Sequence, residues 1–149
     1  MKTFALLSIS LLAQPLYEQA NAHLQAGRLA EAEAGYRAQL KLTPNHVESL
    51  ANLGAVLSKR EKFSEAIQSY QRALKMRPDI APLHLNLGLA YFKSRRWTEA
   101  AASFERFPGN RQAAQLRALS LMELERYGDA ARAFESLLPS DDSTILIGL

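Results

Sequence analysis

The stretch that decides the fold runs from residue 47 to residue 80 and reads VESLANLGAVLSKREKFSEAIQSYQRALKMRPDI. The following stretch, 81–110, reads APLHLNLGLAYFKSRRWTEAAASFERFPGN and repeats the same order of residue types. Within each stretch apolar residues recur every three or four positions, which is the period of an α-helix. Two consecutive units of this kind indicate a chain built from helical repeats.

Three columns of residues extend the repeat in both directions. Small, aromatic and bulky apolar residues keep one register, with steps of 34, 34 and 30 residues; their members are Ala32, Ala66, Ala100 and Ala130, then Tyr36, Tyr70, Phe104 and Phe134, then Leu29, Phe63, Trp97 and Tyr127. Breaks divide each unit into two helices near Gly27, Glu61, Ser94 and Glu125. We predict helices over about 15–26, 29–42, 47–59, 63–76, 81–94, 97–107, 111–124 and 127–138.

The columns have a mechanical explanation. A small residue such as Ala66 lets the second helix of a unit approach the first closely, and the bulky and aromatic residues lie on that same face. Gly54 and Gly88 stand on the first helix, at places where we expect a side chain to collide. Pro44 and Pro78 end the second helix. Each unit is therefore a hairpin of two antiparallel helices.

These residues carry a family resemblance. Leu53-Gly54, Leu57, Ala66, Tyr70, Ala73 and Pro78 resemble the tetratricopeptide-repeat (TPR) pattern, and Leu87-Gly88, Tyr91, Ala100 and Phe104 resemble it again. The resemblance covers about 15–138. It implies an all-α fold: a right-handed TPR solenoid of antiparallel helix pairs, with about four repeats and the start of a fifth. The repeats would occupy about 14–46, 47–80, 81–110 and 111–141, and residues 142–149 (DSTILIGL) would begin the fifth.

Three repeats depart from the family pattern. In the first, Gln19-Ala20 replaces Leu-Gly, and in the fourth Arg117-Ala118 does so. The third is four residues short, because Pro108 follows Phe107 directly. We expect the trimmed second helix to change the local twist. The apolar end of the chain favours a longer array or a tail that folds back over the fourth repeat.

The N-terminus has the order of a secretory signal peptide. Met1 and Lys2 precede a short apolar run, 4–13 (FALLSISLLA), that is too short to span a bilayer. We expect cleavage after Ala13, which leaves 14–149 as the TPR domain and places it in the periplasm or outside the cell. The alternative is a helix that caps the first repeat of a cytoplasmic protein.

The resemblance also implies where a ligand binds. In the family, the first helix of each repeat lines a concave groove that holds a peptide. Ten positions are the candidate peptide-binding residues here: Tyr17, Asn21, Asn52, Lys59, Leu85, Asn86, Leu89, Phe92, Lys93 and Met122. Asn52 and Asn86 lie one repeat apart, and an Asn amide can pair with both groups of a peptide backbone. The alternative is that each Asn hydrogen-bonds locally.

Two further surfaces have competing interpretations. Leu85, Leu89, Phe92, Leu119 and Met122 would suit an amphipathic helix, or a following repeat covers them. A basic edge is formed by Lys59, Arg60 and Lys62, repeated as Lys93, Arg95 and Arg96. It would suit an acidic protein, an anionic lipid or nucleic acid, but cations are also stable at helix C-termini without a ligand.

Catalytic and cofactor motifs are missing from the sequence. There is no cysteine, and the three histidines (His23, His46 and His84) lack partners at metal-ligand spacing. A net charge of +3 does not by itself argue for nucleic acid. We therefore predict a non-catalytic scaffold that binds a protein or peptide, in an envelope complex, without cofactor, metal or small-molecule substrate. The alternative function is a regulatory or substrate-holding arm of a larger enzyme.

Overall fold

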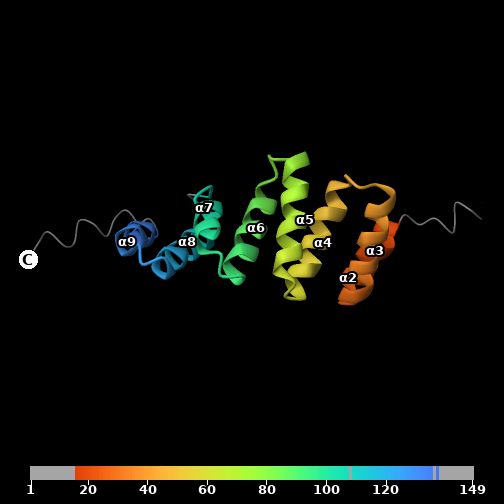
Figure 1. Ribbon diagram of the computed structural model, residues 1–149, viewed down its shortest axis with the longest axis horizontal. Helices are drawn as coiled ribbons and strands as arrows, with labels where there is room; N and C mark the ends of the chain where they lie inside the picture. Colours follow the sequence, from red (N-terminus) through yellow and green to blue (C-terminus); the bar gives the residue numbers. More distant parts are fainter. Residues whose placement is uncertain (1–15, 108, 136, 138–149) are drawn as a thin grey trace, which may run out of the picture. The chain divides into compact units, whose positions relative to one another are not determined.

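Helices form every regular element of the part that the computed structural model describes, which is residues 16–107, 109–135 and 137 (Figure 1). The eight helices are α2 (Leu16–Gln25), α3 (Leu29–Leu42), α4 (Val47–Lys59), α5 (Phe63–Met76), α6 (Ala81–Lys93), α7 (Trp97–Phe104), α8 (Arg111–Glu123) and α9 (Tyr127–Glu135). The helix predicted over 97–107 is shorter than expected, ending at Phe104. The predicted signal peptide, 1–13, and the predicted start of a fifth repeat, 142–149, lie outside the described residues.

The chain divides into an N-terminal unit, residues 1–83, and a C-terminal unit, residues 84–149. In the N-terminal unit α2 packs on α3, α3 on α4 and α4 on α5, so consecutive helices lie side by side (Figure 1). In the C-terminal unit α7 packs on α8 and α8 on α9. Each unit therefore builds its core between neighbours in the sequence, as expected for stacked hairpins.

The same turn reverses the chain inside every hairpin. Its central residue has a left-handed backbone, with φ between 58° and 72°, at Gly27, Glu61, Arg95 and Glu125. At the second turn the amide of Lys62 donates to the carbonyl of Leu57 at 2.9 Å, and equivalent bonds close the other three turns. This pattern is a Schellman cap, which satisfies the last carbonyls of the first helix. The third turn centres on Arg95, one residue later than predicted.

Close contact between glycine and an aromatic ring fixes the spacing of two hairpins. A Cβ built on Gly54 would lie 2.6 Å from Tyr70 Cε1, and one built on Gly88 would lie 2.9 Å from Phe104 Cε1. Real Cβ atoms do not approach carbon that closely, so the expected collision is confirmed. In the first hairpin the glycine is on the other helix, where a Cβ on Gly35 would lie 2.8 Å from the Cβ of Ala20.

The aromatic column is buried in three repeats and exposed in the fourth. Tyr36, Tyr70 and Phe104 are 0%, 2% and 1% exposed, whereas Phe134 is 38% exposed. Tyr127, in the bulky column, is 64% exposed. In the first and third repeats the following first helix packs on the second helix, and the described residues contain no helix after α9. Repetition of a sequence pattern therefore does not guarantee equal burial.

A buried carboxylate ties α3 to the turn between α4 and α5. Glu33 is 7% exposed, and Lys62 Nζ lies 3.0 Å from its Oε1. Arg60 and Arg37 also pair with it, and Arg37 reaches Glu65 at 2.6 Å. Burial opposes ionisation of this carboxyl, but Lys62 and the two guanidinium groups outweigh that effect and lower the pKa of Glu33. The one sign of this ion-pair cluster in the sequence is a carboxylate on an otherwise apolar helix face.

Candidate peptide-binding groove

Three of the predicted binding residues form one hydrogen-bonded cluster in the N-terminal unit. The hydroxyl of Tyr36 donates to Asn21 Oδ1 at 2.6 Å, and Asn52 Nδ2 donates to the same oxygen at 3.1 Å. Asn52 Nδ2 also lies 3.5 Å from the hydroxyl of Tyr17. These residues come from α2, α3 and α4, so the cluster spans two repeats. Burial raises the pKa of Tyr36, which keeps its phenol protonated as a donor.

The cluster leaves one donor group and one acceptor group uncommitted. Asn21 uses its oxygen twice, and among the described residues its Nδ2 has no hydrogen-bond partner. Asn52 uses its Nδ2, and its Oδ1 likewise has no partner in that part of the chain. Both side chains are only partly buried. Two fixed amides on neighbouring first helices thus present a donor and an acceptor.

Two aromatic rings and a histidine border this amide pair. The Tyr17 ring lies 6.1 Å from the ring of Tyr36 and 5.0 Å from that of His46, both tilted. His46 caps α4, because its Nδ1 accepts from the amide of Ser49 at 3.1 Å. The sequence reasoning treated Tyr36 as core and found no role for His46. For Tyr36, the one sign of a polar role in the sequence is its hydroxyl group, which stands in a column of aromatic residues expected to be buried.

The remaining predicted residues are dispersed. Leu85, Asn86, Leu89, Phe92 and Lys93 are all on α6, and Met122 is exposed on α8. Of these, Phe92 makes an edge contact with Trp97, with ring centroids 5.2 Å apart. Asn52 belongs to the N-terminal unit and Asn86 to the C-terminal unit, so a ladder of these two amides stays a prediction. The structure joins Asn52 to Asn21 instead.

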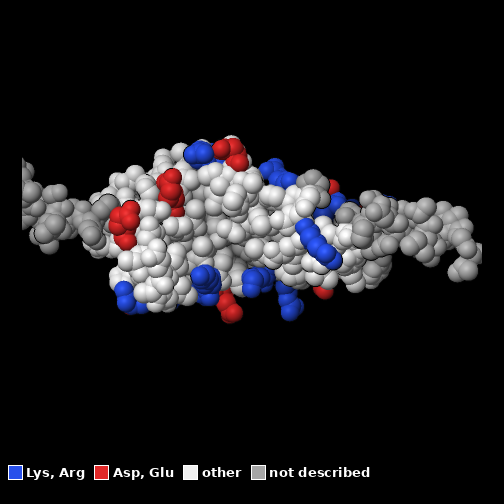
Figure 2. Space-filling model, turned by 180° about the vertical axis from the view of Figure 1, so that it is seen from behind, with Lys and Arg blue, Asp and Glu red and all other residues white. Residues whose placement is uncertain are grey.

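Three of the six cations of the predicted basic edge are neutralised by carboxylates. Arg60 and Lys62 pair with Glu33, while Arg96 pairs with Glu99 and lies 4.8 Å from the centre of the Tyr91 ring. The side chains of Lys59, Lys93 and Arg95 are exposed. On the face drawn in Figure 2, acidic side chains lie among the basic ones. This distribution favours the interpretation of solvated helix ends over a nucleic-acid surface.

Neither a metal centre nor a membrane span is found in the described residues. In 16–107, 109–135 and 137, no group of three His, Asp or Glu side chains could hold a metal ion. No helix of that part is long and apolar enough to cross a bilayer. The amide cluster, by contrast, presents hydrogen-bonding groups on partly buried side chains.

Sequence comparison assigns the repeats to a family. Two models described as tetratricopeptide repeat match residues 11–79 and 52–115. The chain belongs to the tetratricopeptide-repeat family. Together the two matches include both strong repeats and the residues of the amide cluster. The TPR resemblance seen in the sequence is therefore confirmed.

Solved TPR structures share the fold. A MamA structure superimposes with a TM-score of 0.79, at 20% identity over 93% of this chain and 86% of that one. MamA from Desulfovibrio magneticus RS-1 gives 0.77, at 23% identity over 87% of this chain and 76% of that one. A TPR protein from Parabacteroides merdae gives 0.74, at 24% identity over 83% of this chain and 51% of that one. A search among curated proteins found no match. At these identities the likeness shows a common fold.

TPR solenoids are protein–protein interaction modules, and the family assignment gives this TPR chain the same general role. The kind of partner is therefore a protein or a peptide. The predicted all-α solenoid of helix hairpins is confirmed as well.

Proposed function

We propose that the chain binds an extended segment of another protein across the first helices of its first two repeats. The observation that supports this most directly is the fixed amide pair of Asn21 and Asn52. Their free Nδ2 and Oδ1 groups match the carbonyl and the amide of one residue in an extended segment. Tyr17 and His46 would flank that residue with aromatic surface.

The chemistry of the cluster favours a backbone over a terminal carboxylate. Asn52 presents an acceptor oxygen, which would repel a carboxylate, and none of the four hydrogen-bonded cluster residues is cationic. Lys59 is the last residue of α4, at the opposite end of that helix from its N-cap, His46. A partner with an internal extended segment is thus a better fit than one presenting its C-terminus.

Asn52→Ala is the variant that tests the groove. It removes the acceptor but leaves the bond from Tyr36 to Asn21, so the buried phenol keeps its partner. A photo-crosslinker at Ala55, on the same helix, should capture the partner in the wild-type background and lose it with Asn52→Ala. We expect at least a tenfold loss of captured product. The partner's backbone loses a hydrogen bond, and its peptide group is left buried without a partner.

Two controls make the result decisive. Asn45→Ala removes an exposed amide outside any helix and should leave capture unchanged. A crosslinker at Gln68, exposed on α5, should give no Asn52-dependent product. Equal capture by wild type and Asn52→Ala would refute the groove as the binding site.

The envelope setting belongs to the same proposal. The order of residues 1–13, a basic start and a short apolar run, supports export. Expressed with its own N-terminus in a bacterium, the protein should appear in the periplasm with Gln14 as its first residue. Full-length protein retained in the cytoplasm would contradict export and leave the binding groove unaffected.

A further inference from the structure

The second helices of the first three repeats have different kinds of residue at one equivalent position. Glu33, Ile67 and Ala101 stand 34 residues apart. In the first repeat this place holds the buried Glu33 carboxylate, bound by Arg60 and Lys62. In the third repeat it holds a methyl group. The residue equivalent to Lys62, reached by steps of 34 and 30, is Arg126. The C-terminal unit therefore has the equivalent cation but lacks the equivalent carboxylate.

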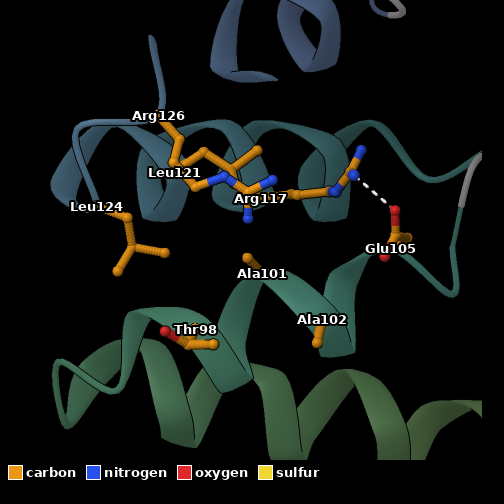
Figure 3. A pocket seen from close by; sticks show the side chains of 8 residues that line it. All are labelled: Thr98, Ala101, Ala102, Glu105, Arg117, Leu121, Leu124 and Arg126. Carbon is orange, nitrogen blue, oxygen red and sulfur yellow. Dashed lines mark hydrogen bonds and ion pairs between the residues drawn. The ribbon is translucent and has the colours of Figure 1, made fainter. Parts of the chain in front are cut away.

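A cavity occupies the seam of the C-terminal unit at this place. It has a volume of about 170 Å³ and lies between α7 and α8 (Figure 3), lined by Thr98, Ala101, Ala102, Glu105, Arg117, Leu121, Leu124 and Arg126. Arg117 stands where the two strong repeats have Leu53 and Leu87. It reaches Glu105 at 2.6 Å, at one end of the cavity, so it does not fill the seam as leucine would.

We propose that this cavity is a site for the acidic side chain of a partner protein, a glutamate or an aspartate that takes the place Glu33 has in the first repeat. A guanidinium has five N–H donors, and Arg117 commits one of them to Glu105. Arg126 shares Asp129 with Arg132, so within the part of the chain that the structure describes two cations have one carboxylate between them. The site is separate from the Asn21–Asn52 groove and does not depend on it.

Size and surroundings restrict the ligand to a side chain. The volume is below the roughly 300–1,000 Å³ of pockets that hold larger ligands. Ala101 and Leu121 are buried, and Leu124 is partly buried, so part of the cavity wall is apolar. Arg117 is the less exposed of the two cations, so a carboxylate paired with it is screened less by water than one on an open surface.

Ala101→Glu tests the site from within the chain. A glutamate at 101 should reach Arg126 as Glu33 reaches Lys62, and should raise Tm at pH 7 by about 2–4 °C over Ala101→Gln. That difference should vanish in the Arg126→Gln background. Gln115→Glu adds the same charge on the exposed face of α8. It should raise Tm over the wild type by less than Ala101→Glu does over Ala101→Gln. If Ala101→Glu and Ala101→Gln melt together, the cavity is not complementary to a carboxylate and the proposal fails.

Binding from outside is tested with N-acetyl-glutamate N-methylamide and its glutamine analogue, titrated into the full chain and followed by amide NMR. The glutamate probe should shift the amides of 98–105 and 117–126 saturably, and the glutamine probe should not. Arg117→Gln or Ala101→Glu should weaken the glutamate probe at least tenfold. No saturable shift, or acetate binding as tightly as the capped glutamate, would overturn the assignment to a peptide side chain.

Discussion

Replacing Gly54 with alanine would place a methyl group inside the van der Waals radius of a buried ring. The new Cβ would lie 2.6 Å from Tyr70 Cε1, and Tyr70 is fully packed. Overpacking of this kind costs about 1–3 kcal/mol, of which the better helix propensity of alanine recovers about 1 kcal/mol. We expect Gly54→Ala to lower the free energy of unfolding, measured by urea titration.

The matched control is Gly128→Ala on α9. A Cβ there meets nothing within 4 Å, so only helix propensity changes and stability should rise by about 0.5 kcal/mol. If both substitutions stabilise the protein, the Gly54 contact is looser than the structure indicates.

Phe104 and Phe134 share a column but differ in burial, which predicts unequal costs of truncation. Phe104→Ala removes a ring that is 1% exposed and should cost about 3–5 kcal/mol. Phe134 is 38% exposed, so Phe134→Ala should cost about 1–2 kcal/mol. Chemical denaturation of the two variants compares them directly. Equal losses would mean that Phe134 is covered in solution.

Between elements, the Glu33 cluster predicts a pH dependence. Its folded pKa lies below the unfolded value, so the ionised carboxylate stabilises the fold above the unfolded pKa of about 4.3. That contribution is lost as the pH falls through the lower, folded pKa. Glu33→Gln should therefore cost about 1–2 kcal/mol at pH 7, because its cations are partly exposed, and little at pH 3.

The control for that prediction lies on the same helix. Glu31 is exposed on α3, and Glu31→Gln should change stability by less than about 0.5 kcal/mol at either pH. A gap between wild type and Glu33→Gln that persists unchanged at pH 3 would show that the glutamine disturbs packing rather than an ion pair.

Over the whole molecule, stability should be uneven along the chain. α4 and α5 each contain six buried residues, while α9 contains two. Because a helix with fewer buried residues opens at lower free energy, α9 should open more readily than α4 or α5. Hydrogen exchange followed by mass spectrometry should therefore show the slowest amides in α4 and α5 and the fastest helical amides in α9. Uniform protection would show that the chain unfolds as one block.

The helices could be predicted well from the sequence because the same pattern of core residues recurs in each repeat. Gly54, Ala66 and Tyr70 specify a hairpin through steric fit, which residue type reveals. The Asn21–Asn52 bond could not be predicted, since it depends on the distance between two helices rather than on either residue. The ends of α7 and the cavity beside Ala101 depend likewise on what fills a seam.

The exchange of glycine between helices has a consequence for descent. In two hairpins the first helix contributes the glycine and the second an aromatic ring, and in the first hairpin Gly35 on the second helix faces Ala20 on the first. Evolution should therefore preserve the combined volume of the two facing side chains rather than either residue by itself. Residues 54 and 70 should therefore covary among descendants of this gene, as should 88 and 104. A mutation that enlarges one of them would persist only where a compensating change had made its counterpart smaller.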